Sequence, residues 1–297
     1  MKIPFIKCQS TGNDFILVME KDLIKKNEQF LEEEKIKFYS VLAKKICKRR
    51  FGIGADGLLI ANLSAEKILM RTFNADGTPD FCMNGLHCLA SYLFDEKKIT
   101  QMGVIEQLGR RIQVKTANNG SVSSLIPAAS FAPSEVPLRK GLPELFMVPI
   151  SVLGSELVVS ALSTGTSHTV VIDDFLPEEE RFIEVSKALE NHPFFPERTS
   201  VVWVAAQDEQ LLKIRIWERG VGETFGCGTG SAAVAAVWSR CKNVQGDFEV
   251  SSIGGSTIVN LEHWDQPIWI TTKPQLVFKG FLYFDPNIEA LHLKSSH

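Results

Sequence analysis

The chain carries one pattern twice, and this repeat constrains the fold more than any other feature of the sequence. Residues 68–94 and 212–238 each read as an apolar strand, a loop with glycine and acidic residues, and Cys-x-x-Gly opening an apolar helix. The two cysteines, Cys82 and Cys227, are 145 residues apart, about half of the 297-residue chain. A duplicated α/β unit is the simplest explanation. Two-fold related halves would bring both helix starts to face each other across a cleft.

Proline content indicates where one half ends and the other begins. Residues 127–149 hold five prolines. Because proline fixes φ and removes a hydrogen-bond donor, we expect this segment to be the crossover between the halves. We therefore predict an N-terminal half over residues 1–130 and a C-terminal half over 131–276, with the tail 277–297 returning to the first half.

Strand patterns dominate the rest of the sequence, with a few helices between them. Periodicity predicts helices over residues 22–50, 83–95 and near 177–191, besides the one that follows Cys227. Strands are predicted over residues 14–20, 57–62, 67–74, 112–116, 121–126, 157–163, 168–174, 200–206, 211–218, 256–263, 267–273 and 276–284.

Composition excludes several classes of function. The net charge of −3 and the pI near 6.1 argue against a nucleic acid or a membrane surface as partner. The first residues lack the apolar core of a signal peptide, and no apolar run approaches the roughly 18 residues of a membrane span. Without an export signal, we expect a cytoplasmic protein whose six cysteines are reduced thiols.

A cysteine at the first turn of a helix suggests acid–base chemistry. The free N–H groups and partial positive charge there favour a thiolate, so we expect a lowered pKa, and the same N–H groups can bind a carboxylate. With Cys82 and Cys227 at one carboxylate, a thiolate would take the proton from one face of Cα. The other thiol would return a proton to the opposite face, inverting the centre without a cofactor.

Two other interpretations of the cysteines are weaker. A cysteine in an apolar segment is usually a small core residue, which is how we interpret Cys8, Cys47, Cys88 and Cys241. Metal binding is the second interpretation, because Cys82, His87 and Cys88 are near neighbours. Their C-x4-H-C spacing matches no common zinc pattern, so no metal site is predicted.

The sequence GIGADG at residues 52–57 satisfies the G-x-G-x-x-G pattern of dinucleotide-binding proteins. That fingerprint requires a strand before it and a helix after it. Here a helical stretch precedes the glycines and a strand follows them. We interpret the segment as a tight loop and predict no nucleotide cofactor.

Five segments together resemble the diaminopimelate epimerase family: STGNDFILV, RRFGIGADGLL, FNADGTPDFCMNG, ERGVGETFGCGTGSAAVAA and a late VFKG. The resemblance implies an α/β (α+β) fold of two pseudo-symmetric domains, each a curled sheet around a central helix, paired as a homodimer. It implies a pyridoxal-independent enzyme that interconverts LL- and meso-2,6-diaminopimelate on the route to lysine and peptidoglycan. Phenazine-type isomerases and proline racemases would be relatives in fold.

The resemblance also implies roles for single residues. Cys82 and Cys227 match the catalytic pair. Glu218 matches the residue that binds the distal ammonium of the substrate, and Arg219 the one that binds the distal carboxylate. The other implied substrate contacts are Asn13, Asn74, the helix starts Met83 and Asn84, and the helix starts Gly228 and Thr229.

The chain departs from the family pattern at positions that bear on the substrate. In the family's C-G-N-G-x-R motif, Met83 replaces the first glycine and His87 replaces the arginine. His87 is either a neutral core residue or a group that tunes Cys82. Thr166 and Ser200 replace two asparagines of the G-N-P-H and T-N-V motifs, and the resemblance implies that they contact the distal end of the substrate, where hydroxyls can still hydrogen-bond with a shorter reach. These changes leave a racemase of another amino acid as an alternative. A non-catalytic amino-acid-binding descendant is more distant, because it would be expected to lose a cysteine.

Overall fold

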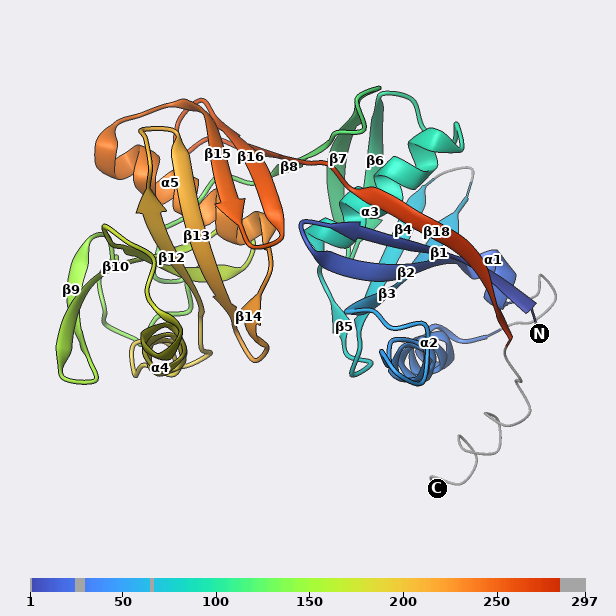
Figure 1. The fold of residues 1–297 in the computed structure, drawn as a ribbon, viewed down its shortest axis with the longest axis horizontal. Helices are drawn as coiled ribbons and strands as arrows, with labels where there is room; N and C mark the ends of the chain where they lie inside the picture. Colours follow the sequence, from blue (N-terminus) through green and yellow to red (C-terminus); the bar gives the residue numbers. More distant parts are fainter. Residues whose placement is uncertain (1, 25–29, 65–66, 284–297) are drawn as a thin grey trace, which may run out of the picture. The chain divides into compact units, whose positions relative to one another are not determined.

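The computed structural model describes residues 2–24, 30–64 and 67–283, which form two compact units. The first unit contains the residues up to Gln9, Asp14–Ile112 and the residues from Pro274 on. The second contains Ser10–Asn13 and Gln113–Lys273. In each unit a sheet curls around one central helix (Figure 1).

The sequence repeat is a repeat of topology. The elements of the first unit that take part are β2 (Asn13–Met19), α2 (Glu32–Ile46), β3 (Gly57–Leu63), β4 (Ile68–Asn74), β5 (Pro79–Asp80), α3 (Met83–Asp95) and β6 (Met102–Gln107). Their counterparts in the second unit are β11 (Ser167–Ile172), α4 (Glu179–Glu190), β12 (Ser200–Ala206), β13 (Leu211–Glu218), β14 (Gly222–Thr224), α5 (Gly228–Lys242) and β15 (Gly246–Ser252).

Strand pairing follows the same rule in both units. β2 and β3 are parallel, β3 and β4 antiparallel, β4 and β5 antiparallel, and β4 and β6 parallel. β11 and β12, β12 and β13, β13 and β14, and β13 and β15 show the same four relations in the same order. The duplicated unit predicted from the sequence is confirmed by this match.

The remaining strands extend the two sheets. They are β1 (Lys2–Ser10), β7 (Arg110–Thr116), β8 (Val122–Ile126), β9 (Val148–Val152), β10 (Ser155–Ser163), β16 (Gly255–Leu261), β17 (Ile268–Thr272) and β18 (Gln275–Tyr283). β18 pairs antiparallel with β1 in the first unit. β8 pairs with β17, so the second unit begins at Gln113, earlier than the residue 130 expected from the prolines.

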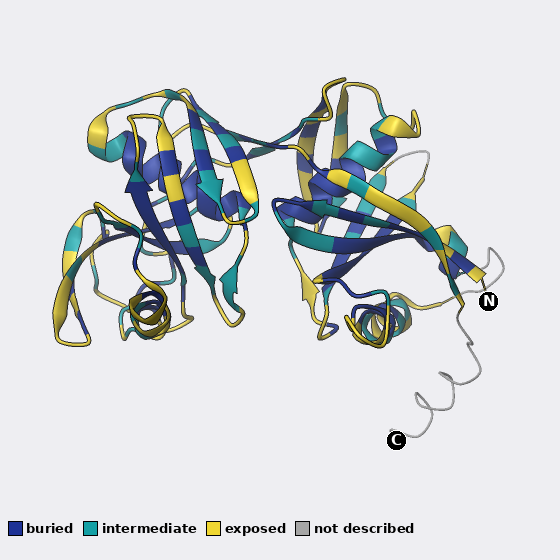
Figure 2. Cartoon of the chain, in the orientation of Figure 1, coloured by how far each residue is buried: buried dark blue, intermediate teal, exposed yellow. Residues whose placement is uncertain are grey.

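The central helices are largely buried, and most of their buried residues are apolar or small. Every residue of α5 from Gly228 to Ser239 is buried, and α3 is buried from Met83 to Ala90 (Figure 2). The outer helices α2 and α4 are amphipathic and bury one face only. Among the described residues, no helix is long and apolar enough to cross a membrane.

The structure confirms one of the predicted helices and corrects another. The helix over 83–95 is confirmed at both ends. The helix over 22–50 is wrong: α1 (Glu20–Leu23) ends early, residues 25–29 lie outside the described residues, and α2 covers only Glu32–Ile46. α2 is confined to the part of the run whose apolar residues recur on one face, which it buries through Tyr39, Leu42, Ala43 and Ile46.

The proline-rich segment packs within the second unit. Val136, Leu138 and Leu145 form a small core cluster with Ala161 and Phe195. Nearby, the guanidinium of Arg240 lies over three aromatic rings, those of Phe131, Phe146 and Trp264, at 4.5, 4.1 and 4.7 Å. The chain passes from the first unit into the second within β7, between Ile112 and Gln113.

Candidate active site

Cys82 and Cys227 are the N-caps of the two central helices and have nearly the same geometry. Their φ/ψ angles are −132°/113° and −138°/116°, and each sulfur accepts a hydrogen bond from the N–H three residues on. The distances are 3.5 Å from Gly85 N to Cys82 Sγ and 3.4 Å from Gly230 N to Cys227 Sγ. Both side chains are partly exposed. The two half-sites therefore share one local structure.

A glycine follows each cysteine by three residues, but packing is too close for a Cβ only at Gly85. A Cβ on Gly85 would lie 2.6 Å from Cδ2 of Leu59, a side chain of β3. At Gly230 a Cβ would lie 3.5 Å from the sulfur of Cys227. Glycine thus lets the first turn of α3 approach the sheet and keeps a side chain away from the thiol of Cys227.

The expected lowering of the cysteine pKa is wrong for Cys227. Burial, and next the negative charge of Glu218, raise the pKa of Cys227 to about 12. Hydrogen bonds from Thr229 and from the N–H groups of Thr229 and Gly230 act in the opposite direction but are outweighed. Desolvation of the sulfur exceeds the helix-terminus effect, so Cys227 holds its proton at neutral pH.

A chain of polar side chains surrounds Cys227. Oγ1 of Thr229 lies 3.3 Å from Sγ, 3.2 Å from Oγ1 of Thr166 and 3.2 Å from Nε2 of His168. Oγ1 of Thr166 and Nε2 of His168 are 2.9 Å apart. Burial, with the charge of Arg219, lowers the pKa of the buried His168 to about 4, so the ring is neutral near pH 7. Thr166, predicted to contact substrate, is therefore connected to Cys227 through Thr229.

His168 is a functional candidate that was assigned no role from the sequence. It ends the motif Gly165-Thr166-Ser167-His168, and a histidine that follows small polar residues was the available signal. Its Nε2 contacts the two threonine hydroxyls, while its buried Nδ1 has no hydrogen-bond partner in the part of the chain that the structure describes.

Glu218 and Arg219 end β13 and begin the turn to β14. The hydroxyl of Thr224 donates to Oε1 of Glu218 at 2.6 Å. Arg219 is exposed, and its Nη1 donates to the carbonyl of Glu197 at 3.1 Å. The N–H of Arg219 donates to Oγ of Ser200 at 3.1 Å. Ser200 was predicted to contact substrate, and the structure gives its hydroxyl a second task, holding the backbone of Arg219.

The predicted contacts of the first half are near the start of α3 or in turns. Met83 and Asn84 are buried in its first turn. Nδ2 of Asn74, at the end of β4, donates to Thr78 Oγ1 at 3.2 Å and to Asp80 Oδ2 at 3.3 Å. Burial lowers the pKa of His87 to about 3, which makes it a neutral core residue.

Asn13 belongs to the second unit, although it begins β2. Its Oδ1 is buried and has no hydrogen-bond partner among residues 2–24, 30–64 and 67–283. A buried acceptor without a partner costs free energy, so this oxygen is a ready site for a ligand donor.

The glycine-rich loop at 52–57 is structural. It follows α2 and precedes β3, the reverse of the dinucleotide arrangement, and Gly54 N donates to the carbonyl of Ile46. Arg49 donates to both oxygens of Asp14, at 3.2 and 2.8 Å, and Lys7 also bonds Asp14. Burial raises the pKa of Asp14, but the hydrogen bonds from Arg49 and Lys7 outweigh it and lower the pKa to about 2.

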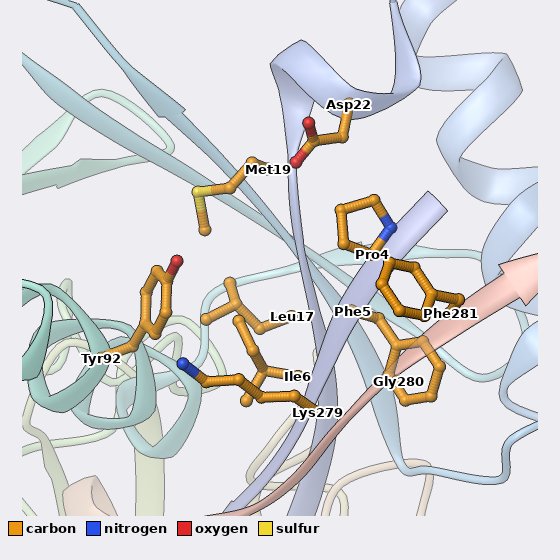
Figure 3. A pocket seen from close by; sticks show the side chains of 10 residues that line it. All are labelled: Pro4, Phe5, Ile6, Leu17, Met19, Asp22, Tyr92, Lys279, Gly280 and Phe281. Carbon is orange, nitrogen blue, oxygen red and sulfur yellow. The ribbon is translucent and has the colours of Figure 1, made fainter. Parts of the chain in front are cut away.

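The first unit also contains a pocket (Figure 3). It is formed by β1, β2, α1, β18 and the far end of α3, and none of the predicted site residues lines it. Its side chains include Phe5, Leu17, Met19, Asp22, Tyr92 and Lys279. Across the described part of the chain, no three His, Cys, Asp or Glu side chains are grouped to hold a metal ion.

Solved structures share this architecture. A phenazine biosynthesis protein of the PhzF family from Enterococcus faecalis aligns with a TM-score of 0.66 at 15% identity, covering 96% of this chain and 100% of that one. A hydroxyproline epimerase from Agrobacterium vitis aligns with a TM-score of 0.65 at 13% identity, covering 96% and 93%. The chain therefore shares the fold of these two proteins, and the predicted fold class is confirmed.

Comparisons of sequence identify the family within this fold. A model of the family described as diaminopimelate epimerase matches residues 160–277. Diaminopimelate epimerase of Carboxydothermus hydrogenoformans is 34% identical over 286 residues, which cover 93% of this chain and 98% of that protein. The chain belongs to the diaminopimelate epimerase family, and the resemblance found in the sequence is confirmed.

Proposed function

We propose that this chain is an isomerase that interconverts LL- and meso-2,6-diaminopimelate without a cofactor, using Cys82 and Cys227 as acid and base. The observation that supports this proposal best is the matched pair of N-cap cysteines, each with the same backbone conformation and the same hydrogen bond to its sulfur. The identity of the substrate is inferred from membership of the family. A cysteine that only fills space in the core requires neither this backbone conformation nor this hydrogen bond.

In the proposed reaction, backbone N–H groups at the helix starts bind the α-carboxylate of the substrate. They belong to Met83 and Asn84 in α3 and to Gly228 and Thr229 in α5. One cysteine, as thiolate, takes the proton from Cα, and the electron pair left behind spreads into the carboxylate. The N–H groups stabilise the added charge. The other cysteine, as thiol, gives its proton to the opposite face of Cα.

Each turnover exchanges the protonation of the two sulfurs. The cysteine that was thiolate ends as thiol, and its partner ends as thiolate, so the product state is ready for the reverse reaction. No proton is gained or lost overall. This is why a single site serves both directions and both stereoisomers.

The high pKa of Cys227 fits this chemistry once substrate is considered. Glu218 contributes to raising that pKa, and we propose that Glu218 binds the distal ammonium of the substrate. The ammonium would neutralise the carboxylate and so lower the cost of forming the thiolate. A thiolate whose pKa is raised by burial is also a stronger base toward a weakly acidic Cα–H than an ordinary thiolate.

The distal end of the substrate is proposed to be recognised by charge and shape together. Arg219 uses Nη1 on the carbonyl of Glu197, and its remaining N–H groups suit a carboxylate. Asn74 and the unpartnered Oδ1 of Asn13 are proposed to contact the amino-acid groups near Cα. Thr166 and Ser200 are proposed to define the rest of the distal site.

We propose further that the protein works in the cytoplasm as a homodimer, and that its product enters lysine and peptidoglycan synthesis. Its substrate is a small amino acid, and we propose neither a nucleic acid nor a membrane as partner. These proposals rest on the family and on the composition of the chain.

Proton NMR in D2O tests the proposal directly. LL-diaminopimelate and a panel of simple L-amino acids are each incubated with enzyme, and deuterium entry at Cα is followed with the appearance of the inverted isomer. We expect exchange and inversion of diaminopimelate alone. Turnover of a different amino acid would keep the two-cysteine chemistry and reassign the substrate. Binding without any exchange would reject an epimerase.

A further inference from the structure

A buried carboxylate ends helix α4. Glu190 is 5% exposed and accepts three hydrogen bonds. Its Oε1 takes one from Gly220 N at 2.8 Å and one from Arg198 Nη1 at 3.1 Å, and its Oε2 takes one from Trp217 Nε1 at 2.7 Å. A charge in this position is costly unless it is fully paired. The three donors provide that pairing.

Two of these donors flank the residues proposed to bind the distal end of the substrate. Trp217 directly precedes Glu218, and Gly220 directly follows Arg219. Glu190 therefore holds the Glu218–Arg219 pair from both sides. Between the two anchors the backbone turns sharply, with Gly220 at φ 76° and Val221 N bonded to the carbonyl of Glu218 at 3.0 Å.

The rest of the segment after α4 supports the same turn. Ser200 accepts the N–H of Arg219, and the carbonyl of Glu197 accepts its guanidinium. These are single neutral acceptors. The carboxylate of Glu190 carries a charge, is buried and contacts both sides of the turn, so it contributes most to fixing the turn.

We propose that Glu190 is a positioning residue for substrate recognition: it fixes the turn that presents Glu218 and Arg219 to the distal ammonium and carboxylate. The inference rests on the proposed function. A guanidinium binds a carboxylate well only when both are held in register, and a displacement of about 1 Å weakens such a contact severely. Without Glu190 the chemistry at Cα would remain and recognition of the distal end would weaken.

The first test is kinetic. Glu190→Gln keeps the size of the side chain and removes its charge. We expect the KM for LL-diaminopimelate to rise roughly 10- to 100-fold, with a much smaller change in kcat, because glutamine lacks the charge, keeps one acceptor oxygen and points an NH2 group at the donor on the other side of the turn. Glu184→Gln, an exposed residue of the same helix, is the matched control and should leave both constants unchanged. A fall in kcat with KM unchanged would overturn the proposal.

The second test does not depend on turnover. Hydrogen–deuterium exchange of the peptide around residues 217–224 should become faster in Glu190→Gln and stay unchanged in Glu184→Gln. Unchanged protection in Glu190→Gln would overturn the proposal. If the wild type failed to epimerise diaminopimelate, the proposed function would fall, and this exchange would still decide whether Glu190 holds the turn.

A second variant covers the case in which Glu190→Gln does not fold. Trp217→Phe removes one donor to Glu190 and keeps an aromatic ring in the cluster around Phe182. We expect a smaller rise in KM and a smaller gain in exchange, both in the same direction. Wild-type values for both would overturn the proposal.

Discussion

At the scale of single residues, the reactivity of Cys227 depends on two opposing effects. Its place at a helix N-terminus stabilises a thiolate, while burial and the nearby Glu218 destabilise it. Burial is the larger effect, so the pKa rises to about 12. Thr229, whose hydroxyl lies 3.3 Å from the sulfur, opposes that rise.

Replacing either cysteine by serine tests the acid–base pair. We expect Cys82→Ser and Cys227→Ser to lower the epimerisation rate roughly 100- to 10,000-fold, because a serine hydroxyl is a far weaker acid than a thiol. The fold should persist, since serine is a favoured N-cap residue. Cys241→Ser, near the end of α5, is the control. Wild-type turnover in Cys227→Ser, measured with circular dichroism as a check of folding, would contradict the two-base mechanism.

Removing the hydroxyl of Thr229 should shift the pH dependence of activity. The hydrogen bond from Thr229 lowers the pKa of Cys227, so Thr229→Val should raise it. The acidic limb of kcat/KM, in the direction where Cys227 is the base, should move to higher pH. Thr229→Ser should restore the wild-type profile. An unchanged profile in Thr229→Val would show that the hydroxyl does not act on the thiolate.

At the scale of elements, the turn between β1 and β2 is held by glycines. Thr11 and Gly12 have φ angles of 48° and 78°. A Cβ on Gly254 would lie 1.9 Å from the carbonyl oxygen of Thr11, and one on Gly226 would lie 2.6 Å from it. The turn thus packs directly against Gly226 in the loop before Cys227, and Asn13 directly follows this turn in the chain.

A methyl group at position 254 should displace this turn. We expect Gly254→Ala to destabilise the fold by about 1–3 kcal/mol, because the clash is with backbone, which cannot rotate away. It should also lower kcat/KM by moving Asn13. Gly255→Ala is the comparison, since a Cβ there meets nothing within 4 Å and only its φ of 126° is strained. Denaturant titration and turnover check both effects, and a Gly254→Ala variant as active as Gly255→Ala would contradict this account.

At the scale of the whole molecule, a charged cluster ties together segments distant in sequence. Asp14 is the second residue of β2, Arg49 follows α2, and Lys7 lies in β1. The cations keep Asp14 ionised in the folded state, with a pKa of about 2 instead of 3.8. A carboxyl group whose pKa is lowered by folding stabilises the protein above its unfolded pKa, and that stabilisation disappears as the pH falls through the folded value.

The Asp14→Asn variant tests this contribution. Near neutral pH it should be less stable than the wild type by roughly 1 kcal/mol, allowing for solvent screening of a partly exposed cluster. The difference should vanish between pH 3.8 and about 2. All five tryptophans lie in the second unit, so tryptophan fluorescence would not report on the first unit, which contains Asp14. Unfolding is therefore followed by far-ultraviolet circular dichroism during denaturant titration. Asp95→Asn, an exposed residue of α3, is the control, and a difference that did not depend on pH would refute the assignment.

Local pattern determined much of this protein from the sequence alone. The duplicated unit, the helix over 83–95 and the N-cap positions of both cysteines follow from periodicity and from the residues at each helix start. The family followed as well, because its motifs are continuous stretches of chain. Such features depend on neighbours within a few residues, and these are printed side by side in the sequence.

Long-range packing decided the rest. The pKa of Cys227 depends on burial and on Glu218, which a reading of the helix start alone does not contain. Ser200 bonds to Arg219, and Glu190 bonds to Trp217 and Gly220, across 19 to 30 residues of chain. Sequence spacing does not specify which donors such a carboxylate will meet. Only the folding of α4, β12 and β13 against one another brings these groups within hydrogen-bond distance.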